Sequence, residues 1–195
     1  MKFAQRDNNG IYLGMVDAVE AIPPDVGFYA PTGITISALG QPPADEPGMW
    51  RDNGTEWVEV ALEEARAATS ARIDAETSAA ITAGFDYEVN GQTLHFSYDA
   101  NDQQNFADTA NAAALALAGV PGVPSSVTWN GWDIARDENG KAVSRSLVRL
   151  AFSPESFLAL YVAGALAHKA ERMEEGGRRK ARAMLAESFE ELGAI

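Results

Sequence analysis

The chain has 195 residues, of which 46% are apolar, so it is long enough for one ordinary domain or two small ones with a buried core. Acidic residues outnumber basic ones by 28 to 15, and the formal net charge of −13 is the reverse of a nucleic-acid-binding footprint. The sequence contains no cysteine, which excludes disulfides, thiolate nucleophiles and thiolate metal ligands.

The first sixty residues are expected to form a small β-rich domain. Short strands flank the Asn-Asn-Gly turn at residues 8–10, and a second pair of strands flanks the turn at residues 52–55. Asn and Gly favour hairpin turns because they tolerate a positive φ angle. Between the hairpins, residues 21–48 are dense in Pro and Gly, which favours turns and extended chain over helix. We therefore assign residues 1–60 to an N-terminal domain.

Residues 61–83 contain no Gly or Pro and are dominated by Ala, Glu and Arg, which predicts a helix. Gly84 is placed to end this helix. The apolar stripe is thin and consists of Leu62, Ala65, Ile73, Ala80 and Ile81. A long helix with so little apolar surface usually connects modules or packs against copies of itself. The segment is therefore predicted to be a connecting helix, with Leu62 and Ile73 as contact residues of a homo-oligomer, a dimer or trimer.

Residues 84–195 show the pattern hairpin, helix, hairpin, helix. The first hairpin turns at Asn90-Gly91 and precedes a helix over about 102–118; the second turns at residues 137–140. Ser153-Pro154-Glu155 then provides a cap residue, a proline and an acid, which together favour a helix start. The predicted fold class is α+β, with a compact C-terminal domain of β-hairpin–helix units.

Gly176-Gly177 is expected to interrupt the last long helix before a final helical stretch. The charged segment 174–180 surrounds this pair of glycines. It is interpreted either as a docking surface for an acidic partner or, more simply, as a solvated turn at a flexible joint.

Residues with catalytic or metal-binding potential are few. His95 lies in a strand and is expected to face solvent or to pack, while His168 lies in a helix where a cation near the C-terminus is favourable. Asp99–Gln103 resembles a calcium loop in its spacing of oxygen side chains, but Gln104 and Ala110 stand where such a loop needs Gly and Glu, so a helix cap is favoured. We predict no catalytic residue, no cofactor and no metal, and hence no enzyme.

The four tryptophans all fall in hairpin segments, where most are expected in the core. Trp129 and Trp132 flank Asn130-Gly131 and are candidates for an exposed aromatic pair. Such a pair would suit a protein contact or, together with Asp99 or Asp133, a carbohydrate-binding or hydrolytic module.

Several motifs in residues 65–173 resemble an uncharacterised C-terminal domain of phage tail and tail-fibre-assembly proteins. These motifs are Arg72-Ile73-x-x-Glu76, Gly84-Phe85-x-Tyr87, His95-Phe96-Ser97-x-Asp99, Gln103-x-Asn105, Val127-Thr128-Trp129, Ser153-Pro154-Glu155-x-Phe157 and His168-Lys169. The N-terminal part is similar to the start of tail-fibre-assembly chaperones through Ile22-Pro23-x-Asp25 and Gly40-Gln41.

The resemblance implies a non-enzymatic phage or prophage tail protein that acts through protein–protein contacts, either as a tail-fibre assembly factor or as a tail component. The partner would be a tail fibre or another tail protein, in the host cytoplasm during assembly and in the virion tail if the protein is retained. No apolar segment near the start is long enough for a secretory signal, and no run is long enough for a membrane span, so no membrane partner is expected.

Overall fold

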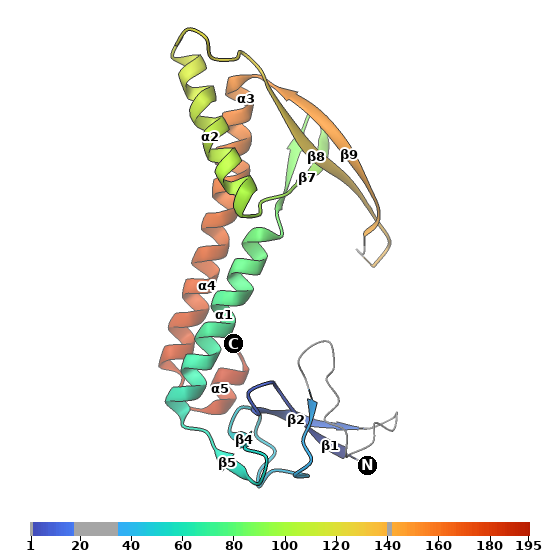
Figure 1. Cartoon of the computed structure of the whole chain (residues 1–195), viewed down its shortest axis with the longest axis vertical. Coiled ribbons are helices and arrows are strands. Elements are labelled where there is room, and N and C mark those ends of the chain that lie inside the picture. The colour runs from blue at the N-terminus through green and yellow to red at the C-terminus, as the bar shows by residue number, and fades with distance from the viewer. Residues whose placement is uncertain (1, 18–34, 140–141) are drawn as a thin grey trace. The chain divides into compact units, whose positions relative to one another are not determined.

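The computed structural model, drawn in Figure 1, describes residues 2–17, 35–139 and 142–195. The structure is 44% helix and 28% strand, so the predicted α+β class is confirmed. The chain forms two compact units: unit 1 joins residues 1–73 to 177–195, and unit 2 spans residues 74–176. These units divide the chain differently from the three predicted segments, because the two halves of each long helix pack with different neighbours.

Unit 1 contains two small antiparallel sheets, which confirms both predicted N-terminal hairpins. The first sheet has the order β2-β1-β3, and the second pairs β4 with β5. Their bounds are β1 Lys2–Arg6, β2 Tyr12–Asp17, β3 Thr35–Ile36, β4 Trp50–Asp52 and β5 Trp57–Glu59. Residues 21–34 of the predicted irregular segment, with the Ile22-Pro23-x-Asp25 motif, lie outside the described residues.

The helical part of unit 1 brings distant stretches of the chain together. It consists of the first half of α1 (Leu62–Thr82), the end of α4 (Ala167–Leu185) and α5 (Phe189–Gly193). Ile73 is fully buried against Ala183, Ala186 and Leu192. The Arg66 guanidinium donates to the Ala186 carbonyl at 2.6 and 2.9 Å and so satisfies a backbone acceptor just beyond the end of α4.

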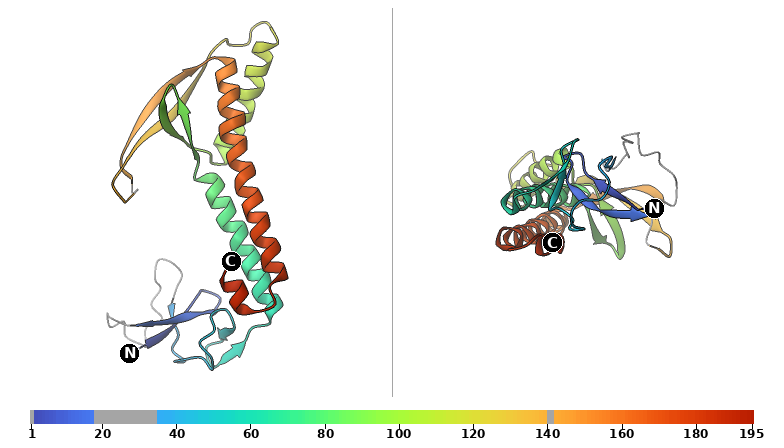
Figure 2. Two further views of the ribbon diagram at one scale, coloured as in Figure 1. Left: turned by 180° about the vertical axis from the view of Figure 1, so that it is seen from behind. Right: turned by 90° about the horizontal axis from the view of Figure 1, so that it is seen from below.

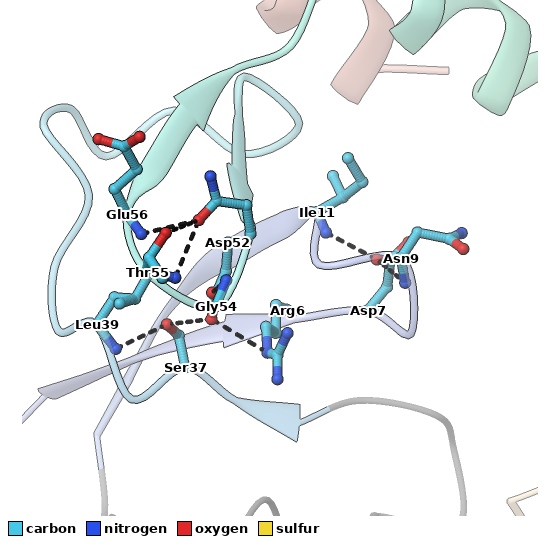
Figure 3. A network of polar contacts seen from close by, with 11 residues as sticks. Arg6, Asp7, Asn9, Ile11, Ser37, Leu39, Asp52, Gly54, Thr55 and Glu56 are labelled. Carbon is cyan, nitrogen blue, oxygen red and sulfur yellow. Dashed lines mark hydrogen bonds and ion pairs between the residues drawn. The ribbon is translucent and has the colours of Figure 1, made fainter.

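The carboxylate of Asp52 ties the strands of unit 1 together (Figure 3). Asp52 is only 6% exposed, yet its oxygens accept bonds from Ser37 Oγ at 2.6 Å and from the Gly54 amide at 2.7 Å. Arg6 Nε lies 3.3 Å from the same carboxylate. A buried carboxylate is tolerated only when it is paired and hydrogen-bonded. Asp52 therefore links β1, β4 and the chain that follows β3.

Replacing Asp52 with alanine is expected to lower the free energy of unfolding by about 1–3 kcal/mol, because Ser37 and Arg6 lose their shared acceptor. Chemical denaturation followed by tryptophan fluorescence measures this loss. Asp7→Ala is the matched control: that carboxylate also accepts two backbone amides, those of Asn9 and Ile11 at 2.8 Å, but at an exposed turn without an ion pair to Arg6. Equal losses in the two variants would contradict the central role of Asp52.

Unit 2 is built on a four-stranded antiparallel sheet with the order β6-β7-β8-β9. Helices lie against one face of this sheet (Figures 1 and 2). The bounds are β6 Phe85–Val89, β7 Gln92–Phe96, α2 Ala100–Leu117, β8 Val127–Arg136, β9 Ala142–Phe152, α3 Pro154–Ala159 and the π-helical segment η1 Leu160–Leu166. The predicted hairpins and helices from residue 84 to 166 are thus confirmed.

The predicted helix caps of unit 2 are also confirmed. Asp99 accepts bonds from the amides of Asn101 and Asp102 at 2.8 and 2.9 Å, and Ser153 accepts from the amide of Ser156 at 3.2 Å. Because Asp99 is the cap, α2 begins at Ala100, two residues earlier than the sequence pattern indicates.

An aromatic cluster centred on Phe106 forms the core of unit 2. Phe106 is fully buried, with ring centroids 4.4 Å from Trp129, 5.7 Å from Tyr98 and 5.8 Å from both Phe85 and Phe157. These rings come from α2, both hairpins and α3, together with the residues that follow β7. Packing within this cluster holds the helices against the sheet.

Gly176 and Gly177 do not interrupt the last long helix, so that prediction is wrong. Helix α4 runs through both residues, and the break comes later, before α5, whose cap is Ser188. Gly176 is buried, and a Cβ atom there would lie 2.3 Å from Thr77 Oγ1. The glycine allows α1 and α4 to approach closely at this point, and the charged segment 174–180 is helical surface rather than a flexible turn.

Candidate protein-binding groove

Unit 1 carries an open groove of about 930 Å³ whose walls are mostly apolar. Helix α1 contributes Ala65, Ala68 and Ala71, which share one face because side chains three and four residues apart line up on a helix. Their small side chains leave the space that a larger residue would fill. The other walls are built from β2 and its flanks, the turn before β4, the residue that follows β5, and α5. They include Leu13, Pro47, Val60, Phe189 and Leu192.

Four charged residues line the groove: Asp7, Arg51, Glu64 and Arg72. Arg51 of β4 forms an ion pair with Glu64 in the first turn of α1. Asp7 and Asn9 line another part of the groove from the turn between β1 and β2. The arrangement places polar groups beside apolar walls, as many binding sites do.

Tyr12 forms a fixed part of the wall. Its side chain is fully buried, its ring lies 5.7 Å from that of Trp57 in an edge-to-face contact, and its hydroxyl donates to Asp45. Burial raises the pKa of the Tyr12 hydroxyl well above its ordinary value, and the hydrogen bond to Asp45 and the charge of that carboxylate add to the effect. Tyr12 therefore stays protonated and packs as a neutral residue.

A second, more polar cavity of about 450 Å³ in unit 2 is lined by both histidines of the chain. His95 Nδ1 lies 2.8 Å from Asp86 Oδ1, and its Nε2 lies 3.0 Å from the carbonyl oxygen of Ala83. His168 Nε2 lies 3.2 Å from the carbonyl oxygen of Ile81. Both histidines therefore bind carbonyl groups at the C-terminal end of α1, which the helix itself leaves unpaired.

This geometry assigns the histidines a structural role. Both ring nitrogens of His95 contact oxygen atoms of the protein, one from Asp86 and one from the backbone after α1, so the ring is held in place by the fold. His95 was expected to face solvent or to pack, and His168 to lie near the C-terminus of its own helix. The placement of His168 is wrong, because His168 is the second residue of α4, which continues to Leu185. The helix terminus that His168 contacts belongs to α1, through the Ile81 carbonyl. The Asp86–His95 pairing did have a signal, because a two-residue Asn90-Gly91 turn fixes these residues opposite each other.

Trp129 and Trp132 lie on opposite faces of the sheet, so they do not form the exposed aromatic pair considered from the sequence. They are three residues apart in an uninterrupted stretch of β8, and successive side chains in a strand alternate between faces. Trp129 packs in the core against Phe106 and Phe157. Trp132 faces the other way, with the Arg145 guanidinium 3.7 Å from its ring centroid.

The other predicted contact residues are taken up within the fold. Ile73 is fully buried in the core of unit 1, and Leu62 is half-buried beside it, so Ile73 offers no surface to a second chain. Asp99 is committed to capping α2, and Asp133 lies on β8 opposite Ser146. The structure does not bring Asp99 or Asp133 together with a pair of exposed tryptophans.

In the described ranges, no group of three His, Cys, Asp or Glu side chains is placed to hold a metal ion. Among the helices of the described residues, none combines the length and the apolar character needed to cross a membrane. The groove of unit 1 was not predicted from the sequence, although alanines that recur every three residues along the first half of α1, at 65, 68 and 71, were a usable signal for a face of small side chains.

Comparison with known proteins adds one identification. No curated protein matches the chain, and no solved structure matches it. A family model described as a domain of unknown function, DUF4376, matches residues 64–194, which is more than half of the chain. The chain therefore belongs to the DUF4376 family.

Proposed function

We propose that this protein is a non-enzymatic component of a phage or prophage tail system that acts by binding another protein, as a tail-fibre assembly factor or as a structural component. The motifs that resemble phage tail proteins support this proposal. Most of them lie within residues 65–173, inside the segment 64–194 that the family model matches, and two lie nearer the N-terminus, at residues 22–25 and 40–41.

The observation that carries the proposal is the groove of unit 1. Its apolar walls expose surface that a partner's side chains would remove from water, at roughly 25 cal/mol for each Å² of apolar area buried. Ala65, Ala68 and Ala71 leave room for such side chains. The groove thus suits an apolar stretch of a partner protein, such as a segment of an incompletely folded tail fibre.

The residues of the phage-like motifs hold the fold of unit 2 together. Asp99 caps α2, and the Gln103 side chain accepts from Lys169 at 2.8 Å and donates to the Tyr98 carbonyl at 3.2 Å. Ser153 caps α3, and Phe157 packs in the aromatic core. Because each of these side chains has a role in folding, the motifs describe a scaffold on which binding surfaces are carried.

Filling the groove tests the proposal. Ala68→Trp places a large ring in the groove, whereas Ala67→Trp places the same ring on the neighbouring position of α1, which does not line it. After co-expression with the adjacent tail-fibre gene, we expect Ala68→Trp to reduce co-purification of the fibre about tenfold or more, as loss of a central contact does, and Ala67→Trp to leave it unchanged. Circular dichroism establishes that both variants fold.

Two results would overturn parts of this proposal. Fibre that is equally soluble and assembled without this protein contradicts the assembly-factor role, and equal binding by both tryptophan variants contradicts the groove. Mass spectrometry of purified virions separates the two remaining roles, because a structural component persists in the particle and an assembly factor leaves it.

A further inference from the structure

The sheet of unit 2 ends in two unlike edges. In the order β6-β7-β8-β9, each outer strand has a neighbour on one side only among the described residues. Strand β9, visible at the margin of the sheet in Figure 1, is eleven residues long and exposed over most of its length. Such an edge presents unpaired backbone donors and acceptors and is a template for another strand.

The two edges carry opposite charges on the same face of the sheet. On β9, Arg145 and Arg149 lie on the face opposite the core, and the strand contains no acidic residue. On β6, Asp86 and Glu88 lie on that same face, and the strand contains no basic residue. Arg149 and Glu88 are exposed and, in the part of the chain that the structure describes, neither forms an ion pair.

The apolar faces of the two edges match as well. Val148 and Leu150 of β9 and Tyr87 and Val89 of β6 all pack at the margin of the same core. Placing β6 beside β9 therefore continues both faces: apolar side chains meet apolar ones, and the arginines meet the acids. Strand direction also agrees, because four alternating strands leave β9 antiparallel to β6.

From these features we infer that copies of this chain associate head to tail, with β9 of one copy pairing with β6 of the next. The contact is heterologous, so it repeats around a ring or along a filament rather than closing on itself as a twofold pair. This inference is independent of the identity of any tail partner, because both edges belong to this chain.

A second copy of β9 is a less well matched occupant of the β9 edge, and the charges themselves have an alternative reading. If two copies of β9 paired with the pairing centred on or near Arg145 and Arg149, arginines of the two copies would lie opposite each other, which is unfavourable. Charged residues on an edge strand also commonly serve to prevent unwanted pairing. That device works when the edges repel each other, whereas here the two edges attract.

Charge exchange tests the pairing in the full chain. Sedimentation velocity over a concentration series should show self-association of the wild type. Arg149→Glu and Glu88→Arg should each raise the dissociation constant about tenfold, because each puts like charges across the junction. The double variant should restore association, and so should an equimolar mixture of the two single variants. Arg178→Glu makes the same change of net charge on the exposed surface of α4 and should have no effect.

Each remaining outcome overturns the inference. A wild-type chain that is monomeric at every concentration shows that β9 does not pair with β6. Weakened association in Arg149→Glu without any effect of Glu88→Arg shows that β9 pairs with a surface of the chain other than β6. Failure of the double variant to recover, with circular dichroism unchanged, shows that the charges do not face each other.

Discussion

Gly84→Ala is expected to destabilise unit 2 by about 3 kcal/mol. Gly84 ends α1 with φ at +91°, and an added Cβ would lie 2.3 Å from the carbonyl oxygen of Phe96 and 2.9 Å from His95 Nε2. The left-handed backbone costs an alanine about 1–2 kcal/mol, and overpacking against a backbone atom adds about 1–3 kcal/mol. The substitution also displaces His95 from the end of α1.

Gly91→Ala is the matched control for this prediction. Gly91 has nearly the same backbone angle, φ +81°, but no atom lies within 4 Å of its added Cβ. Gly91→Ala should therefore lower the free energy of unfolding only by the cost of the left-handed backbone, about 1 kcal/mol. Urea denaturation followed by circular dichroism compares the two variants. Equal losses would contradict the close approach of the Phe96 carbonyl to Gly84.

Phe106→Ala is expected to lower the free energy of unfolding by about 3–5 kcal/mol, the usual range for removing a large buried aromatic side chain. Phe106 is fully buried at the centre of the aromatic cluster, so its loss leaves a cavity bordered by Trp129, Phe157 and Phe85. Those rings come from separate elements and cannot all move inward together. Near-ultraviolet circular dichroism should weaken along with the drop in unfolding free energy.

Leu117→Ala provides the comparison for Phe106→Ala in the same helix. Leu117 is 48% exposed near the end of α2, so its truncation should change the unfolding free energy by no more than about 0.5 kcal/mol. If both variants unfold at the same denaturant concentration, the aromatic cluster is not the main contributor to the stability of unit 2.

The elements that the sequence predicted are those set by local chemistry. Asn90-Gly91 defines a hairpin on its own, because φ is positive at both residues and the strands on either side alternate in polarity. Ser153-Pro154 and Asp99 define helix starts through bonds to amides only two or three residues away. Such features need no knowledge of the rest of the chain.

The features that the sequence did not predict depend on contacts between distant residues. A glycine pair reads as a helix break, but Gly176 serves instead as the point where α4 passes Thr77 of α1. The alternation of side chains in a strand separates Trp129 from Trp132, but which face is covered depends on where α2 and α3 pack. The groove is likewise built from stretches far apart in the chain.

Unit 1 joins the two ends of the chain, so it can be completed only after unit 2 has been synthesised. Residues 74–176 form unit 2 as one uninterrupted stretch, so this part can fold as soon as it leaves the ribosome. The burial of Ile73 comes later, because the residues that bury it, Ala183, Ala186 and Leu192, are translated after unit 2. A ribosome that stalls or terminates after unit 2 therefore releases a chain with an exposed Ile73, an incomplete product that proteases can recognise.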